Sequence, residues 1–269
     1  MKYAIVNNEK REAIKGVKGT CPSCGSELVA KCGKFKINHW AHKGTRVCDS
    51  LWETETEWHR IWKKEYPLDW QEFPLKDPDT DEKHIADIRA ADGLVIEFQH
   101  SYIDPKERAS RERFYGNMIW VVDGTRLKRD YSRFLKARSG FRETNKKGLH
   151  LVDYLEEVFP TSWLDSSVPV IFDFKGLEDI SDGSDMRQRL YCLFPVRTGR
   201  YSILAEFSRK VFIKTTVSGE WTIRCRDFLE GLMPKKDQPE LNKKSQPKPR
   251  ESTHYYDTKK GRFIKKWRF

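Results

Sequence analysis

The amino-acid sequence predicts a mixed α/β or α+β protein whose central part runs helix, strand, strand, strand, helix, strand. A capped stretch with helical spacing over residues 51–65 indicates the first helix. An Asp-Gly pair between two strand-like runs indicates a hairpin, and the apolar run Met118–Asp123 indicates a buried strand. We expect four parts: an N-terminal hairpin and Cys/His module (1–50), the core (51–150), a small β-rich extension (151–233) and a basic flexible tail (234–269).

Composition limits the class of protein. The chain of 269 residues has 13% aromatic residues, nine of them Trp, which is enough to bury a hydrophobic core. Its net charge of +11 favours a polyanionic partner. No apolar run approaches the length of a membrane span, and the start of the chain resembles no signal peptide, so we expect a cytoplasmic protein with no membrane partner. Internal repeats, a Walker-type loop and a Ser-His-Asp arrangement are absent from the sequence.

The first part combines a hairpin with clustered metal-binding residue types. Residues 1–19 predict two short strands joined at Asn7-Asn8. Clustered Cys and His in a cytoplasmic protein favour zinc over disulfides, and a Cys-x-x-Cys turn presents two thiolates together. Four protein ligands would make a structural Zn²⁺ site, because no open position remains. Cys21 and Cys24 are expected ligands; His42 and Cys48 are favoured as the other two, His39 is the substitute, and Cys32 is also within reach.

A helix over residues 51–65 is expected next, capped by Asp49 or Ser50 and ended by Pro67. Its spacing predicts that Glu55 and His59 share one helix face. An ordinary surface helix is the alternative interpretation. A strand over residues 68–73 and an acidic turn over 76–82 should follow.

The central hairpin, residues 84–101, carries the residues of chemical interest. Glu97 and Gln99 lie two positions apart, so their side chains point to the same face of the second strand. Asp87 lies on the partner strand, where its carboxylate can approach that of Glu97. Two carboxylates held together need a cation between them, and Mg²⁺ prefers such oxygen ligands. The alternative is a half-buried hairpin whose polar residues face water.

A helix from Asp104 to Tyr115, capped by Asp104 with Pro105 at its first position, follows the hairpin. It can offer Arg108 and Arg111 to a phosphate backbone. Beyond residue 124 the sequence predicts helices over 126–138 and 151–159, strands over 168–174, 189–194, 201–207 and 210–214, and a helix closing near 231. Cys192 and Cys225 are expected to be packing residues.

The tail, residues 234–269, carries twelve Lys/Arg against four Asp/Glu, or +8 of the total +11. Its last residues interleave aromatics with cations, among them Lys265 and Lys266. This mixture suits base stacking with phosphate contacts. Docking of the aromatics on the fold is the alternative.

These residues bear a resemblance to a known family. Asp87, a hairpin and then Glu97-Phe98-Gln99 resemble the metal-binding signature of the PD-(D/E)XK nuclease superfamily, whose core is αβββαβ. The sequence of roughly residues 18–124 resembles the branch of this superfamily that is similar to the competence protein CoiA. Besides the hairpin, two motifs carry this resemblance: His39-Trp-Ala-His42 after Cys-Pro-x-Cys, and Glu55-Thr-Glu-Trp-His59-Arg-Ile-Trp-Lys63.

The resemblance implies a metal-dependent deoxyribonuclease. Asp87, Glu97 and the carbonyl of residue 98 would ligate Mg²⁺ (or Mn²⁺), Gln99 would orient water, and Glu55 would support the metal with His59 beside it. The superfamily usually has Lys at the position of Gln99, and Gln lacks its positive charge; Lys63, His59, His84 or His100 could substitute. DNA is the expected partner, together with other proteins of DNA processing, competence or defence. A non-catalytic DNA-binding subunit is the alternative, and an RNA substrate a weaker third. Expected nucleic-acid contacts are Lys63, Arg108, Arg111, Lys265 and Lys266.

Overall fold

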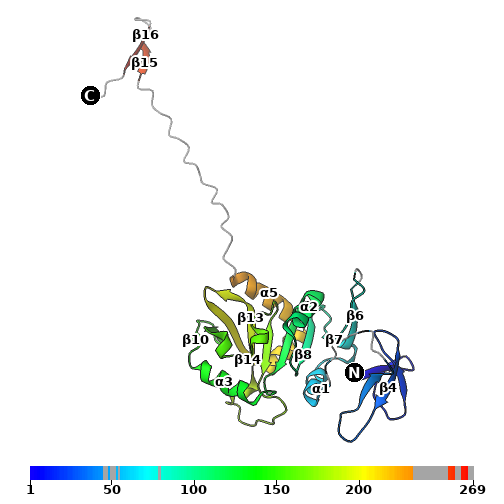
Figure 1. The fold of residues 1–269 in the computed structure, drawn as a ribbon. Helices are drawn as coiled ribbons and strands as arrows, with labels where there is room; N and C mark the ends of the chain where they lie inside the picture. The colour runs from blue at the N-terminus through cyan, green and yellow to red at the C-terminus, as the bar shows by residue number, and fades with distance from the viewer. Residues whose placement is uncertain are drawn as a thin grey trace. The chain divides into compact units, whose positions relative to one another are not determined.

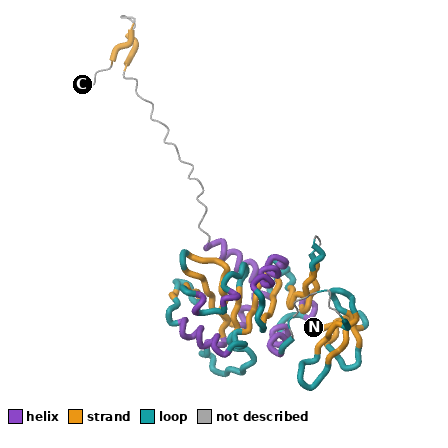
Figure 2. Tube along the Cα trace, viewed as in Figure 1, coloured by secondary structure: helices purple, strands orange, loops and turns teal. Residues whose placement is uncertain are grey.

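The computed structural model describes residues 1–44, 48, 53, 55–77 and 80–231, and the backbone of 232, 254–257 and 262–265. Two compact units are present, Met1–Glu230 and Gly231–Phe269. The first is an α+β unit in which helices and strands interleave along the chain (Figures 1 and 2). This confirms the predicted class. In the described part of the chain, no helix has both the length and the apolar character needed to cross a membrane.

The N-terminal module is a five-stranded antiparallel sheet with the order β2-β1-β3-β4-β5. Asn7 and Asn8 both have positive φ, of 53° and 66°, as a type I′ hairpin turn requires, so the predicted first hairpin is confirmed. Trp40 and Leu28 lie at the centre of a small core. The strands are β1 (Tyr3–Val6), β2 (Glu9–Glu12), β3 (Lys18–Thr20), β4 (Glu27–Lys31) and β5 (His39–His42).

The rest of the first unit is built on one nine-stranded sheet with the order β10-β11-β14-β13-β12-β9-β8-β7-β6. Its strands are β6 (Gln71–Lys76), β7 (Lys83–Arg89), β8 (Val95–Gln99), β9 (Met118–Asp123), β10 (Arg142–Glu143), β11 (Leu149–Val152), β12 (Val170–Asp173), β13 (Arg189–Thr198) and β14 (Tyr201–Ser208). The helices are α1 (Glu57–Lys64), α2 (Pro105–Tyr115), α3 (Lys128–Arg138), α4 (Arg209–Val217) and α5 (Glu220–Leu232). Short 3₁₀ turns cover Leu68–Trp70, Leu155–Glu157, Thr161–Trp163 and Met186–Gln188. In the second unit, β15 (His254–Asp257) pairs with β16 (Arg262–Lys265).

The central order predicted from the sequence is present as α1, β6, β7, β8, α2 and β9. Gly93 has φ of 84° in the turn between β7 and β8, where a side chain would be strained. The Asp104 carboxylate accepts a 2.8 Å hydrogen bond from the Lys106 N–H, with Pro105 at the first helical position, so the predicted cap of α2 is confirmed.

The start of the first helix was predicted too early. α1 begins at Glu57 because Thr56 caps it, and the His59 side chain accepts a hydrogen bond from the Thr56 N–H in a capping box. Glu55 therefore precedes the helix and does not share a helix face with His59. The proposed caps Asp49 and Ser50 lie outside the described residues. The strand expected over 68–73 is a 3₁₀ turn followed by β6.

The sheet crosses the domain boundary predicted at residue 150. β9 pairs in parallel with β12, and β13, β14, β11 and β10 follow by antiparallel pairing. Two elements of the extension were predicted wrongly. Residues 210–214 lie in α4, which Ser208 caps through a 3.2 Å bond from the Val211 N–H. Residues 151–159 form the end of β11 and a 3₁₀ turn. Cys192 is fully buried, as expected for a packing residue.

Helices cover both faces of the large sheet. On one face, Trp120 of β9 donates from its indole N–H to Glu112 of α2 at 3.2 Å, and Phe134 of α3 packs in the same core cluster as Trp120. On the opposite face, Trp62 of α1 stacks on Phe98 of β8 with ring centroids 5.5 Å apart. Alternation along β8 thus sends Phe98 towards α1 and Glu97 towards α2.

Asp173, at the end of β12, fixes α1 and α4 to the sheet. Its Oδ2 accepts indole N–H bonds from Trp58 at 2.9 Å and Trp62 at 3.0 Å. Arg209 of α4 pairs with the same oxygen at 2.5 Å and lies 4.0 Å from the ring centre of Trp62. Asp173 is completely buried, and its other oxygen, Oδ1, accepts from the Lys175 N–H at 3.1 Å, so protein donors replace the hydration of both oxygens.

Asp173→Ala should lower the free energy of unfolding by roughly 3–5 kcal/mol, because it leaves buried donors and the Arg209 charge without their acceptor. Urea unfolding followed by circular dichroism measures this. Asp179→Ala, at an exposed position of the following loop, is the control and should change stability by less than about 0.5 kcal/mol. Equal stability of the two variants would contradict the anchoring role.

Candidate functional site

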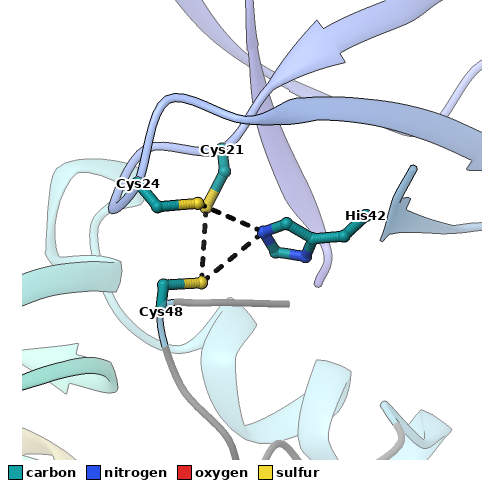
Figure 3. Close-up of side chains that lie close together, drawn as sticks. All are labelled: Cys21, Cys24, His42 and Cys48. Carbon is teal, nitrogen blue, oxygen red and sulfur yellow. Dashed lines mark hydrogen bonds between the residues drawn. The ribbon is translucent and has the colours of Figure 1, made fainter. Parts of the chain in front are cut away.

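The predicted zinc ligands meet in the N-terminal module. Figure 3 shows the thiols of Cys21, Cys24 and Cys48 gathered around the ring of His42. The Cys21 and Cys48 sulfurs are 3.8 Å apart, and His42 Nε2 lies 3.4 Å from the Cys24 sulfur and 3.5 Å from that of Cys48. Tetrahedral zinc with bonds of about 2.3 Å to sulfur and about 2.0 Å to nitrogen would set sulfurs about 3.8 Å apart and sulfur and nitrogen about 3.5 Å apart. The four ligand atoms therefore fit a structural zinc ion.

Local backbone structure forms this arrangement. Between β3 and β4, the Gly25 N–H donates to the Cys21 carbonyl and the Cys21 N–H donates to the Ser26 carbonyl, each at 2.9 Å. This turn presents Cys21 and Cys24 on one side, and His42 ends β5. The favoured pair His42 and Cys48 is thus confirmed as part of the group. His39 instead contacts the Ile37 carbonyl at 2.9 Å, and Cys32 donates to the Ala13 carbonyl at 3.6 Å.

The three thiols of this group differ in their pKa values. Burial raises the pKa of Cys21, and burial with the nearby Cys21 charge raises the pKa of Cys48 to about 12. For Cys24, burial is outweighed by hydrogen bonding to Ser26 and His42, and its pKa falls to about 6. Since Zn²⁺ binds thiolates, its binding would release the protons held at Cys21 and Cys48.

A second site lies where β7 and β8 separate. The ladder pairs Ile88 with Ile96, and the next step of that register sets Asp87 opposite Glu97. There the Phe98 N–H donates at 2.9 Å to the Asp87 carboxylate. Asp87 and Glu97 line a cavity of about 320 Å³, which we call the acidic cavity. Its other lining residues are Glu53, Glu55, His59, Ile85, Phe98, Gln99, Ser101, Tyr102, Ile103, Asp104, Glu107 and Arg111.

The positive charge of Lys63 offsets the negative charge of three carboxylates behind this cavity. Its ammonium group lies 2.8 Å from Asp87, 3.0 Å from Glu55 and 3.3 Å from Glu72. Only 1% of Lys63 is exposed. Burial alone would lower the pKa of Lys63, but the three carboxylates raise it well above its usual value. Lys63 is therefore a permanent cation, and its burial corrects the prediction that it contacts a phosphate backbone.

Glu72 connects this network to the N-terminal module. The backbone N–H groups of Lys2 and Tyr3 donate to its two carboxylate oxygens at 2.7 and 2.9 Å. Glu72 adopts a positive φ of 44°, which is uncommon for a residue with a side chain. The start of β1 is thereby tied to the ammonium group that pairs with Asp87.

His59 is the residue of α1 that lines the acidic cavity. Its Nε2 is 3.1 Å from the Phe98 carbonyl and 3.5 Å from Glu53. Burial lowers the pKa of His59, but the bond to Glu53 and the charge of Asp87 outweigh it and raise the pKa. The Phe98 carbonyl has two lone pairs, so contact with His59 still leaves one for a cation.

Two acidic residues in and beside this site, Glu53 and Asp123, were not predicted as site residues from the sequence. Glu53 accepts hydrogen bonds from the N–H groups of His100 and Ser101, and so fixes the chain after β8. His100 Nδ1 lies 2.8 Å from Asp123 of β9. Glu53 stands in an acid-rich run in which nothing singles it out, and its partners lie 47 and 48 positions away. Asp123 ends a strand-like run, which was the available signal.

The structure places the other predicted site residues in different surroundings. Gln99 lines the acidic cavity and donates to the Ser101 carbonyl at 3.2 Å. Arg111 also lines it, paired with Glu107 at 2.9 Å and 4.0 Å from Glu97. Arg108 is buried against Glu112 at 2.5 Å, which corrects its predicted phosphate contact. His84 packs on Phe114 with ring centroids 4.5 Å apart. The Lys265 side chain and Lys266 lie outside the described residues.

The acidic cavity suits a hard divalent cation by the chemistry of its donors. Asp87, Glu97 and the Phe98 carbonyl offer the oxygen atoms that Mg²⁺ prefers. Glu55 adds a buried Oε1 that has no hydrogen-bond partner among the described residues. These acids are less closely gathered than the zinc ligands. Within the described ranges, three or more Cys, His, Asp or Glu ligand atoms lie within 4.8 Å of one another in one place, at Cys21, Cys24, His42 and Cys48.

Two comparisons with known proteins both find similarity to competence protein CoiA. Residues 5–51 match the family described as "Competence protein CoiA, N-terminal domain". The chain is 28% identical over 145 residues to the protein named competence protein CoiA of Bacillus subtilis (strain 168). That match covers 49% of this chain and 38% of the relative, so the chain spans well under half of the relative's length. No solved structure matches the chain. The resemblance to the CoiA-like family expected from the sequence is confirmed.

Cys24→Ser should release the zinc that we expect purified protein to contain, and should destabilise the fold, because the binding energy of a structural metal is also folding energy. Elemental analysis of metal per chain and thermal unfolding measure the two effects. Cys32→Ser is the matched control, since Cys32 lies in the same module and outside the four-ligand group. Wild-type protein without zinc would contradict the site.

Proposed function

Starting from the relation of this chain to the CoiA-like family, we propose that it is a metal-dependent deoxyribonuclease of the PD-(D/E)XK type. The observation that carries this proposal is that Asp87 and Glu97 line one cavity, together with Phe98, where β7 and β8 separate. The order α1, β6, β7, β8, α2, β9 supports it, because αβββαβ is the order of that core.

The residues of the acidic cavity have separate roles in this proposal. Asp87, Glu97 and the Phe98 carbonyl would hold Mg²⁺ or Mn²⁺, with Glu55 beside them. A bound Mg²⁺ would polarise the scissile phosphate and lower the pKa of the attacking water. Gln99 would orient that water by hydrogen bonding. Lys63 holds Asp87 in place, and Arg111 brings a positive charge to the wall of the cavity where Gln99 lacks one.

The zinc site has a structural role in the proposal. All four of its ligands come from the protein, so no coordination position is open for a substrate. Because the relative is named a competence protein, processing of DNA in competence is the pathway that we propose first. Defence against foreign DNA and other DNA-processing systems are alternatives, each with its own protein partners.

A non-catalytic DNA-binding subunit is the second candidate. Gln99 favours it, since an amide cannot carry the charge of the usual Lys, and so does Lys63, whose ammonium group occupies one side of Asp87. The two candidates differ in one measurement. Wild-type protein that binds DNA and leaves it intact with Mg²⁺ or Mn²⁺ would favour the subunit.

Glu97→Ala should abolish Mg²⁺-dependent cleavage of DNA and leave DNA binding largely intact, because it removes one of the two carboxylates that would hold the metal. Gel analysis of a labelled duplex measures cleavage, and fluorescence anisotropy measures binding. Glu65→Ala, at an exposed position after α1, is the control and should cleave like wild type. Wild-type rates in Glu97→Ala would exclude this cavity as the active site.

Truncation after Met233 should weaken DNA binding most at low salt, because the tail holds +8 of the net charge. Each phosphate contact contributes roughly −0.9 to the slope of log affinity against log salt. The truncated protein should therefore show a shallower slope, with its zinc content unchanged as the control. Parallel lines for the two proteins would mean that the tail makes no phosphate contacts.

A further inference from the structure

The segment that begins α3 carries exposed cations without acidic partners. Between Arg126 and Arg138 the chain has six Lys/Arg and one acid, Asp130. Asp130 pairs with Arg133 at 3.1 Å, and Arg138 pairs with Glu206 at 2.6 Å. Arg126, Lys128 and Arg129 are exposed and form no ion pair with a described residue. Their charge is therefore available to a partner.

Arg126, the first of these cations, lines a cavity that is next to the acidic cavity. This second cavity, of about 260 Å³, is lined by Arg126, Leu127 and Asp130 from this segment and by His100 from the end of β8. Ser101, Tyr102 and Ile103 line both this cavity and the acidic cavity. One loop is thus the common wall of the two, so the basic segment and the candidate catalytic acids are neighbours.

The common wall also presents an aromatic ring. Tyr102 is 63% exposed, so its ring is accessible from solvent beside both cavities. An exposed ring beside cations is the combination that binds nucleic-acid strands, because bases stack on the ring while phosphates contact the cations.

The acidic cavity creates a need for such a surface. Glu53, Glu55, Asp87 and Glu97 line it and repel a polyanion, whereas Lys63 and Arg108 are buried in ion pairs. A phosphate backbone needs exposed positive charge close to the cavity in order to approach.

We infer that Arg126, Lys128, Arg129 and Tyr102 form the surface that holds a nucleic-acid strand beside the acidic cavity. The inference deepens the proposed function, since it assigns the substrate-holding surface of that site. The cations contact the phosphate backbone, and Tyr102 stacks on a base next to the opening of the cavity.

The charge contribution is tested with the full chain without added Mg²⁺ or Mn²⁺, which withholds the metal for cleavage, and without a chelator, so that the zinc site keeps its metal. Lys128→Ala/Arg129→Ala removes two charges from α3, and Lys210→Ala/Lys214→Ala removes two from exposed positions of α4. Binding of one labelled single strand is followed by anisotropy at several salt concentrations. The α3 variant should lower the magnitude of the log–log slope by up to about 1.4, for two lost contacts at about 0.7 each, and the α4 variant should keep the wild-type slope. The tail is present in all of these proteins, so its contribution to the slope cancels in the comparison. Equal slopes in both variants would overturn the inference and favour an acidic protein as the partner of this surface.

The ring is tested with Tyr102→Ala and Tyr102→Phe. The Ala variant should bind a single strand about tenfold more weakly, and the Phe variant should bind like wild type because it keeps the ring. Equal loss in both variants, or none in either, would remove Tyr102 from the surface. Cleavage by wild type is measured in parallel with Mg²⁺. If wild type does not cleave but the α3 variant loses slope, the nuclease proposal fails and this inference stands. If wild type cleaves and the α3 variant binds like its control, this inference alone fails.

Discussion

The ammonium group of Lys63 contacts three carboxylates that come from separate parts of the chain: Glu55 before α1, Glu72 on β6 and Asp87 on β7. A buried ion pair is weak evidence for stability, because the cost of desolvation offsets much of the attraction. Its effect here is on geometry. With Lys63 fully buried, α1 must lie where its ammonium group meets all three acids, and this position brings His59 to the Phe98 carbonyl. The acidic cavity is shaped by that constraint.

The sequence predicted the elements whose signals are local. The N-terminal cap of α2, the turn at Gly93 and the apolar run of β9 each need only neighbouring residues, and each is present. Residues 210–214 were misread because Val211, Phe212 and Ile213 are typical strand residues. The buried residues Phe212, Thr215 and Thr216 show the helical spacing that would have corrected this. The continuation of the sheet through β12 to β10 depends on which strands pair, and pairing between distant strands leaves little trace in local periodicity.

The same difference between local and long-range signals explains how much of each site could be predicted from the sequence. The zinc ligands lie within one short segment and are of types that share one chemistry, so the group could be predicted almost completely. The contacts around the acidic cavity join residues far apart in the chain, such as Glu53 with His100 and His100 with Asp123. Asp87 and Glu97 could be predicted because two carboxylates on neighbouring strands are typical of a metal site. The burial of Lys63 and Arg108 could not be predicted, because charged residues on predicted helices usually face solvent.

The two carboxylate oxygens of Glu72 accept hydrogen bonds from the N–H groups of Lys2 and Tyr3 at the start of β1, and the oxygen that accepts from Lys2 also accepts from the Lys63 ammonium group. The module that would fold around zinc and the acids that would bind magnesium therefore share a buried charge. Thermodynamic coupling between two ligands is reciprocal, so any strengthening of magnesium binding by zinc is matched by an equal strengthening of zinc binding by magnesium. If both sites bind their metals as proposed, this single side chain would let the metal content of one site affect the affinity of the other.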